Sequence, residues 1–490
     1  MLRLVFMSLL VHDWTIQLVQ TRANSMGKNQ TILPDLSALI PVMPEAGKRS
    51  RALYTAIRRL IETGQLPAGA KLPTTRDLAR RLSLSRGAAV EAYEVLVAEG
   101  FAEARVGAGT FVAAKVPRLS PDMPKTAGDE PHYSGPPHPC TLGIAMADER
   151  TRQLFRQLLH RRLERPQPNF YDYGDPRGER ELRQAIADYA KVARGVRCHP
   201  GQIIVTSGIR HGLDLVMRAI LRPGDAVWLE DPCYLSAHAT VAGLGLAIVP
   251  VPVDREGIDV AAGEAVGGKA AAVYCTPSHQ FPLGVTMTMR RRLALIDWAK
   301  RNGAWIFEDD YDSEFRFSGP PLASIQGMDD AGRVIYLGSF SKVLFPGLRV
   351  GYAILPEPLV EPVLAQRRQM DRQPPSLPQG AIADLLNEGH FAAHLRRVRK
   401  RAEACRNALV EGLRDKASAP EQGLHLIAGL ADDSDDEALA AAALKLGIGA
   451  SPLSTHCLAA PKRRGLILGY SGFEPQELHR AGRSLAEIMR

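Results

Sequence analysis

Short apolar runs alternate with longer amphipathic segments in the middle of the chain. Strands are predicted at residues 202–206, 226–230, 246–251, 270–275, 304–308 and 334–338, and the helices between them include 210–221 and 290–301. This alternation is typical of an α/β domain in which helices cover a largely parallel sheet. From about residue 359 to 490 the helical patterns are long and strands are few, which predicts a smaller α+β subdomain.

Residues 53–112 carry a different pattern, with three helical segments followed by a hairpin. Thr74 or Thr75 is expected to begin the second helix and Ser85 the third. The core-facing positions predicted for the third helix are Val90, Tyr93, Leu96 and Val97. Two short alternating runs around Gly107 predict a β wing. A helix, a short turn and another helix form the geometry that lays the later helix in the major groove of DNA.

The length and the linker composition divide the chain. A chain of 490 residues is too long for a single core, so more than one domain is expected. Residues 115–140 are rich in proline and glycine and are interpreted as a linker. We therefore predict one domain at 46–114 and another at 141–490. Residues 1–45 are interpreted as an N-terminal tail or as the product of an upstream start site.

The positive charge is concentrated in the N-terminal domain. The net charge is +8, and between residues 46 and 115 twelve Lys and Arg stand against six Asp and Glu. Such an excess predicts a polyanionic partner such as double-stranded DNA. Arg76 and Arg86 stand at the starts of consecutive predicted helices, where they can contact phosphates or base edges. Either arginine taken alone is equally consistent with an ordinary solvated side chain.

The cysteines and the first residues exclude several classes of protein. The six cysteines are scattered and form no Cys-x-x-Cys pair, which argues against a disulfide framework and against a structural zinc site. A reducing, cytoplasmic location is therefore expected, with no bound metal. The apolar run at residues 1–11 is much shorter than the roughly 20 residues that a membrane span needs, so no membrane partner is expected.

One lysine stands where a charged side chain would be costly. The segment GSFSKVLFPGLRVGY, residues 338–352, places Lys342 directly after a predicted buried strand. A lysine forms an imine with an aldehyde once it has lost its proton, and burial beside another cation lowers its pKa toward that state. Arg349 is the expected cation. A loop lysine without a function is the alternative.

Pyridoxal 5′-phosphate (PLP) is an aldehyde cofactor that needs three further groups, and the sequence offers a candidate for each. These are a phosphate cradle, a carboxylate for the ring nitrogen and a donor to the ring hydroxyl. Asp309 or Asp310 follows a predicted strand and is expected at the carboxyl edge of the sheet, where Asp309 with Tyr311 could reach the ring nitrogen and the ring oxygen. A strand–Ser207–Gly208–helix junction, with Ser339 and Arg349, can bind phosphate. An acidic cluster in this position is otherwise a solvated turn or a metal site.

The N-terminal pattern resembles a known DNA-binding domain. The segment LPAGAKLPTTRDLARRLSLSRGAAVEAYEVLVAEGFAEARVGAGTFV is similar along its whole length to the winged-helix domain of the GntR family. The resemblance implies DNA contacts from Arg76, Ser85 and Arg86 and from the wing near Gly107. The family usually has Thr or Asn close behind the Ser–Arg pair, whereas this chain has Gly87 and Ala88.

The rest of the chain resembles fold-type-I aminotransferases. More closely, the segments GDPRGERELRQAIADYAKVARGV, EDPCY, TPSHQFPLG, EDDYDSEFRF and GSFSKVLFPGLRVGY are similar to the MocR subfamily of GntR-type regulators. In that subfamily a winged helix is joined by a linker to an aminotransferase-like domain that binds PLP. The resemblance thus implies a multidomain chain with an α/β fold-type-I domain after the winged helix.

The resemblance also implies a role for individual residues. Lys342 would be the Schiff-base lysine, Asp309 the partner of the pyridine nitrogen, and Tyr311 the donor to the ring hydroxyl. The further residues implied to contact the cofactor are Tyr234 as a stacking aromatic, and Ser339 and Arg349 as phosphate ligands.

Three positions are less clearly assigned. Tyr173 would reach the phosphate of a neighbouring subunit, which implies a homodimer. His279 is expected near the ring without a fixed role. Arg210 departs from the subfamily pattern, and it either adds a cation to the phosphate site or distorts the cradle.

The function expected from this assembly is transcription regulation. The winged helix would bind an operator, and the large domain would sense PLP or an amino compound through a Lys342 aldimine. The alternative is an active PLP-dependent aminotransferase with a DNA-binding appendage, for which Arg464 is a candidate clamp for a substrate carboxylate. A third interpretation makes the large domain a dimerisation scaffold only.

Overall fold

The computed structural model describes residues 49–115, 136–166, 170–266, 269–319, 322–459 and 461–490. The chain divides into two compact units, Met1–Tyr133 and Ser134–Arg490. The predicted tail at 1–45 and most of the predicted linker at 115–140 lie outside the described residues. Among the described helices, none combines the length and the apolar character needed to cross a membrane.

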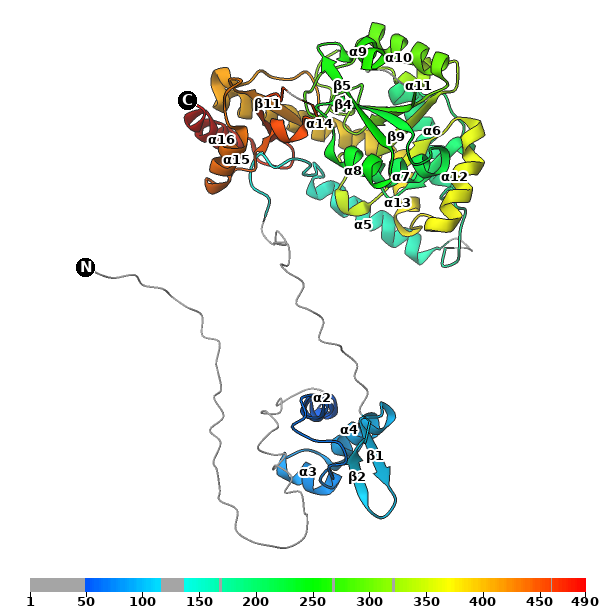
Figure 1. The fold of residues 1–490 in the computed structure, drawn as a ribbon, viewed down its shortest axis with the longest axis vertical. Helices are drawn as coiled ribbons and strands as arrows, with labels where there is room; N and C mark the ends of the chain where they lie inside the picture. Colours follow the sequence, from blue (N-terminus) through cyan, green and yellow to red (C-terminus); the bar gives the residue numbers. More distant parts are fainter. Residues whose placement is uncertain (1–48, 116–135, 167–169, 267–268, 320–321, 460) are drawn as a thin grey trace, which may run out of the picture. The chain divides into compact units, whose positions relative to one another are not determined.

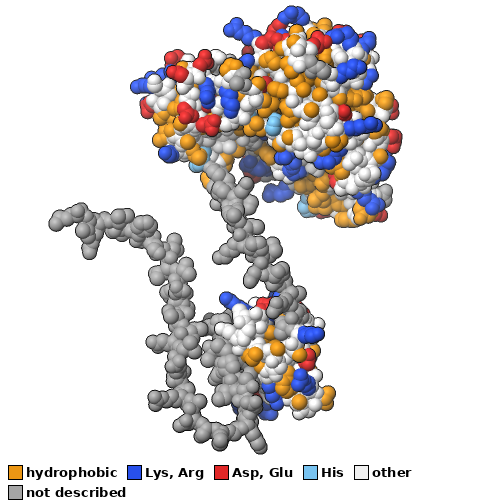
Figure 2. All heavy atoms as spheres, in the orientation of Figure 1, with side chains coloured by type: hydrophobic (Ala, Val, Ile, Leu, Met, Phe, Trp, Pro, Cys, Tyr) orange, Lys and Arg blue, Asp and Glu red, His pale blue; other side chains and the backbone are white. Residues whose placement is uncertain are grey.

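The small unit is a three-helix domain with a β wing (Figure 1). Its elements are α2 (Arg49–Glu62), α3 (Thr75–Arg81), α4 (Arg86–Ala98), β1 (Ala102–Arg105) and β2 (Gly109–Val112). The two strands form an antiparallel hairpin, as expected around Gly107. Leu53, Ile57 and Leu96 are fully buried and form the centre of an apolar core. Lys and Arg side chains stand on the surface of this unit in Figure 2.

Helix caps fix the starts of α3 and α4. Thr74 is the N-cap of α3, and its side chain accepts a hydrogen bond from the backbone N–H of Asp77. Ser85 is the N-cap of α4, and its Oγ accepts from the N–H of Ala88 at 3.2 Å. The prediction that Val97 faces the core is wrong, because its side chain is 37% exposed. The buried face of α4 consists of Ala89, Ala92, Tyr93 and Leu96.

The large unit is built on an eight-stranded sheet in the order β3-β10-β9-β8-β7-β4-β5-β6. The strands are β3 (Ile203–Thr206), β4 (Ala226–Asp231), β5 (Ala247–Asp254), β6 (Gly257–Ile258), β7 (Ala270–Cys275), β8 (Trp305–Asp310), β9 (Val334–Ser339) and β10 (Gly351–Ile354). The ladders between β9, β8, β7, β4 and β5 are parallel, and β10 and β6 run antiparallel to their neighbours. The predicted α/β class is confirmed.

Helices cover both faces of this sheet (Figure 1). On one face pack α5 (Glu149–Glu164), α6 (Arg180–Arg194), α9 (Val260–Val266), α10 (Met289–Asn302), α11 (Ile325–Met328) and α13 (Leu377–Asn387). On the other face pack α7 (Ile209–Ile220), α8 (Leu235–Gly243) and α12 (Glu357–Met370). Short 3-10 turns η1 (Pro200–Gln202) and η2 (Pro346–Leu348) connect elements. The central strands are buried on both faces, which explains their continuous apolar character.

A smaller subdomain completes the large unit. It contains α14 (His390–Leu413), η3 (Arg414–Lys416), β11 (His425–Gly429), α15 (Asp436–Lys445), β12 (Ser451–Pro452), η4 (Leu453–His456), β13 (Gly465–Gly469) and α16 (Pro475–Ile488). The structure differs from the predicted start near residue 359, because α12 and α13 pack on helices of the large sheet. The core of the subdomain instead includes Cys140, which comes from the segment before the large sheet.

Candidate functional site

The carboxyl ends of the parallel strands converge on one cavity in the large unit. β8 ends at Asp310 and β9 at Ser339, while β3 leads through Gly208 into α7. A cavity of about 490 Å³ opens at this edge of the sheet, where ligands bind in α/β folds. The predicted site residues that line it are Lys342, Asp309, Tyr311, Tyr234, Ser339, Arg349 and Arg210.

Lys342 is positioned shortly after the end of β9. Burial lowers the pKa of its ammonium, and the carboxylates of Asp312 and Asp309 oppose that shift. The prediction that Arg349 lowers the pKa of Lys342 is wrong, because burial causes the shift. A Cβ placed on Gly143 would lie 2.8 Å from Lys342 Nζ, so the backbone at Gly143 closely approaches the amine. The amine is therefore held where it loses its proton more readily than a solvated lysine does.

Among the described residues, one carboxylate oxygen of Asp309 has a hydrogen-bond partner and the other has none. Its Oδ2 accepts a hydrogen bond from the Tyr274 hydroxyl at 2.5 Å. Its Oδ1 is buried and has no hydrogen-bond partner among the described residues. Burial, opposed by the bond from Tyr274, raises the pKa of Asp309 to about 7. A buried acceptor without a partner is costly, so this oxygen favours a donor or a cation inside the cavity.

An anion site lies at the start of α7. Gly208 is the N-cap of this helix with φ 100°, and the first N–H groups of α7 are available to an anion. A Cβ on Gly208 would lie 3.7 Å from the Arg349 guanidinium, which places that cation beside the helix start. Arg210 is exposed in the first turn and Ser339 lies at the end of β9. Two cations at the positive end of a helix dipole repel each other unless an anion joins them.

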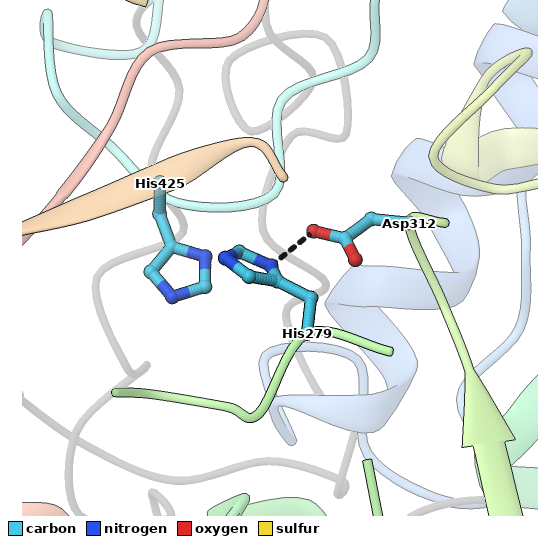
Figure 3. Close-up of side chains that lie close together, drawn as sticks. All are labelled: His279, Asp312 and His425. Atoms are coloured by element: carbon cyan, nitrogen blue, oxygen red, sulfur yellow. Dashed lines mark hydrogen bonds and ion pairs between the residues drawn. The ribbon is translucent and has the colours of Figure 1, made fainter. Parts of the chain in front are cut away.

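His279 lies behind the cavity and not on its lining. Its Nδ1 is 2.9 Å from Asp312 Oδ2 and 3.0 Å from the Tyr311 hydroxyl. Figure 3 shows the Asp312 carboxylate at one side of the His279 ring and His425 at the other. Donor atoms of these three buried residues lie within 4.8 Å of one another. Only Nδ1 of His279 is hydrogen-bonded within this group, so we interpret the contact with Asp312 as the one that orients the ring.

Two predicted site residues stand outside the cavity. Tyr173 is 66% exposed, and the Arg372 guanidinium lies 3.6 Å from its ring centroid. Its contact with a neighbouring subunit stays a prediction. The proposed carboxylate clamp is not at the cavity, because Arg464 Nη1 binds Asp436 Oδ1 at 3.0 Å. Asp436 is fully buried and also accepts from Ser454, so this arginine stabilises the small subdomain.

Several lining residues were not foreseen from the sequence, and the aromatic and histidine side chains among them are Tyr274, Phe281, His425 and His456. Tyr274 lies at the end of β7, so the rule that located Asp309 at a strand end would also have found it. His425 on β11 and His456 on η4 come from the small subdomain, and no local signal links them to Lys342.

The candidate DNA-contacting residues of the small unit are all exposed. Arg76 lies in the first turn of α3, and Ser85 and Arg86 begin α4. Gly107 is exposed in the turn of the wing with φ 75°. Within the described part of the chain, neither Arg76 nor Arg86 has an acidic partner, whereas Arg80 pairs with Asp77 at 2.8 Å. Exposed arginines without acidic partners at helix starts suit phosphate contacts.

Comparisons with known proteins identify both units. Residues 49–112 match the family model of bacterial regulatory proteins of the gntR family, and residues 147–460 match aminotransferase class I and II. The chain is 36% identical over 464 residues to the probable rhizopine catabolism regulatory protein MocR of Rhizobium meliloti, covering 89% of this chain and 92% of that protein.

Two further matches agree with this division. The HTH-type pyridoxine biosynthesis transcriptional regulator PdxR of Corynebacterium glutamicum is 32% identical over 434 residues, covering 87% of this chain and 92% of that protein. A solved archaeal alanine:glyoxylate aminotransferase superposes with a TM-score of 0.68 at 26% identity, covering 73% of this chain and 91% of that chain.

The aminotransferase fold implies dependence on PLP, and the cavity fits that cofactor. The unpartnered Asp309 Oδ1 suits a protonated ring nitrogen, and the start of α7 with Arg349 suits a phosphate. The gntR domain in turn implies DNA binding. The chain belongs to the MocR-type regulators of the GntR family, in which a winged-helix domain and an aminotransferase-like domain form one polypeptide.

Proposed function

We propose that this protein regulates transcription by binding PLP at Lys342 and responding there to an amino compound. The observation that carries the proposal is the pairing of a desolvated lysine with a buried carboxylate that lacks a partner. Neither feature benefits a protein that uses its large unit only as a scaffold, because both cost folding free energy.

Each residue of the cavity has a task in this proposal. When bound, PLP supplies an aldehyde that condenses with a neutral primary amine. Lys342 provides that amine, and burial keeps it ready to lose its proton. Oδ1 of Asp309 would accept a hydrogen bond from the protonated ring nitrogen, while the Tyr274 hydroxyl donates to Oδ2 and so orients the carboxylate.

The remaining lining residues bind and orient. The start of α7, Arg349, Ser339 and Arg210 bind the phosphate. Tyr234 and Tyr311 line the cavity, where Tyr234 would stack on the ring and Tyr311 would donate to the ring hydroxyl. Because the Tyr311 hydroxyl lies 3.0 Å from His279 Nδ1, His279 positions it from behind.

Regulation needs two arrangements of the protein that differ in ligand affinity. A homodimer of the large unit, with Tyr173 reaching across, would carry two winged helices to two half-sites. A ligand shifts the equilibrium between the two arrangements only to the extent that its affinities for them differ. We propose that PLP, or an amine that takes the place of Lys342, supplies this difference.

An active aminotransferase is the second candidate. The likeness to a solved aminotransferase over 73% of the chain favours it. The engagement of Arg464 by Asp436 disfavours it, since a substrate carboxylate then lacks that clamp. The two candidates are separated by incubating the protein with an amino donor and a keto acid and measuring product formation. Sustained turnover supports the enzyme.

The test of the regulator is a footprint on the DNA upstream of its own gene. The protein is compared without PLP, with PLP and with PLP plus a panel of amines. We expect the footprint or the affinity to change between at least two of these states. Identical footprints and affinities in all of them would reject the proposal.

A further inference from the structure

A second group of cavity residues is independent of the anion site. Phe281, His425 and His456 line the cavity together, and we call them the histidine wall. The Phe281 ring centroid lies 5.1 Å from that of His425 and 5.4 Å from that of His456. The ring centroid of Tyr234 lies 5.7 Å from that of the same phenylalanine. The wall therefore adjoins the tyrosine proposed to stack on the cofactor, where a ligand amine would arrive.

Both histidines of the wall are fixed in one tautomer by backbone carbonyls. His456 Nδ1 lies 3.0 Å from the carbonyl oxygen of Cys233, and His425 Nε2 lies 3.0 Å from that of Pro282. A carbonyl oxygen only accepts hydrogen bonds, so each of these nitrogens carries the proton. The other nitrogen of each ring is then a bare acceptor. Burial lowers the pKa of both rings, which keeps them neutral.

A third acceptor lies beside His425. His279 donates from Nδ1 to the Asp312 carboxylate, and in the neutral tautomer with this proton its Nε2 is an acceptor as well. That Nε2 is buried, on a side chain that is 1% exposed, and has no partner among the described residues. The ring centroids of His279 and His425 lie 4.8 Å apart with the planes tilted by 44°, and in Figure 3 one nitrogen of each ring is turned toward the other ring. Two buried acceptor nitrogens turned toward each other lack a hydrogen-bond donor, so a ligand that brings a donor to them gains affinity.

Two of the three described cations that line the cavity, Arg210 and Arg349, belong to the anion site at α7. The third is Lys342, which reacts with the cofactor in the proposed function. A carboxylate is an acceptor only. Placed against the histidine wall it would leave its own oxygens and the ring nitrogens unpaired in a desolvated space, which costs affinity.

We infer that the cavity selects a primary amine that carries hydroxyl or ammonium donors and no carboxylate. The histidine wall accepts hydrogen bonds from those donors, while the amine itself goes to the place of Lys342. This inference rests on the proposed function, because an amine is read there only if PLP is bound. It extends that function by naming the chemical class of the effector.

The test compares three amines on the PLP-loaded full-length protein. The probes are 3-amino-1-propanol, β-alanine and n-butylamine, which offer a hydroxyl, a carboxylate and a methyl group on similar chains. Binding is followed by the absorbance of the cofactor and independently by calorimetry. We expect half-saturation at a concentration about tenfold lower for 3-amino-1-propanol than for either other probe.

The possible outcomes separate the inference from the proposed function. Equal or tighter binding of β-alanine overturns the inference, and so does equal binding of n-butylamine. A lack of response to all three probes while the absorbance of bound PLP is intact overturns it as well. Failure of the protein to take up PLP at Lys342 counts instead against the proposed function.

Variants at position 456 assign the selectivity to the histidine wall. His456→Phe removes the acceptor, and we expect the tenfold preference to disappear. His456→Asn keeps a donor for the Cys233 carbonyl and an acceptor for the ligand, so part of the preference should remain. His456→Arg adds a cation and should turn the preference toward β-alanine. Unchanged selectivity in all variants that retain PLP absorbance would overturn the assignment, and His425→Phe repeats the test if His456→Phe does not fold.

Discussion

The two units of this chain place their charged side chains in opposite ways. In the described part of the small unit every fully buried side chain is apolar, and Arg76 and Arg86 are exposed. In the large unit Asp309 and Asp312 are almost fully buried, and Lys342 is desolvated. The same residue types thus serve as surface contacts in one unit and as interior groups in the other.

This difference reflects two kinds of chemistry. A polyanion is bound in water by cations that release counterions, so exposure is an advantage and salt weakens the contact. Covalent binding of an aldehyde needs an amine without its proton, and solvation of the ammonium would favour the protonated form. The large unit can bury such groups because its sheet is covered on both faces and supplies an extensive core.

The largest effect is expected from Lys342→Ala, which removes the buried amine of the large unit. We expect complete loss of the absorbance of covalently bound PLP, because no other described lysine lines the cavity. Binding of the small unit to non-specific DNA should not change, since Lys342 belongs to the other unit. Spectroscopy and borohydride labelling of the peptide that carries residue 342 measure the effect. Lys300→Ala, an exposed lysine of α10, is the control, and labelling that persists in Lys342→Ala would contradict the assignment.

Asp309→Asn tests the cost of a buried charge. Burial raises the pKa of Asp309 to about 7, from an ordinary value near 3.8. The folded protein therefore binds the proton more tightly than the unfolded chain. The stability that this group contributes is present below about pH 4 and is lost as the pH rises to about 7. At neutral pH the substitution should stabilise the cofactor-free protein by up to about 4 kcal/mol.

The measurement is the unfolding free energy of cofactor-free protein across this pH range. Glu230 and Glu314 also have pKa values raised by burial to about 7. In Asp309→Asn the fall of the unfolding free energy with rising pH should therefore become shallower and not vanish. In the PLP-loaded protein the sign should reverse, because the amide that replaces the carboxylate offers no charge to the ring nitrogen. A cofactor-free variant less stable than the parent at pH 7 would show that the buried carboxylate is not a burden.

Arg86→Ala tests the exposed cations. We expect operator affinity to fall about tenfold and the slope of log affinity against log salt to decrease by about one. PLP absorbance should stay at its parental value. Arg301→Ala removes an exposed arginine of α10 that pairs with Asp297 and Glu264, and it serves as the matched control. An equal loss in both variants would indicate a general charge effect in place of a specific contact.

The smallest expected effect belongs to Ser85. Ser85→Ala removes the cap of α4 and should destabilise the small unit by about 1 kcal/mol, measured by thermal unfolding. Ser85→Asp keeps a capping oxygen and adds a negative charge at the helix start. It should preserve stability while weakening DNA binding. If Ser85→Asp bound DNA as well as the parent, the start of α4 would not face the phosphates.

The sequence located the framework of the large unit better than its periphery. The predicted strands correspond to β3, β4, β5, β7, β8 and β9 because buried parallel strands are continuous apolar runs. β10 was missed, since its four residues follow the lysine loop without a separate pattern. The boundary near 359 was misplaced because helical periodicity does not reveal which surface a helix covers.

The site divides in the same way. Lys342, Asp309 and Tyr311 were predictable because motifs at strand ends carry them. His425 and His456 were not, because they reach the cavity only when the small subdomain packs against the large sheet. Arg464 was misleading, since sequence alone cannot reveal that a buried Asp436 occupies it.

The close approach of Gly143 to Lys342 Nζ has one more consequence. The amine is roofed by main chain, and residues 136–143 are the first described residues after the segment that joins the two units. A larger group on that nitrogen competes with the roof for space. Cys140, three residues before Gly143, is buried in the core of the small subdomain, and its carbonyl accepts a hydrogen bond from the Gly469 N–H at 2.9 Å, so displacement of the roof would be passed into that subdomain.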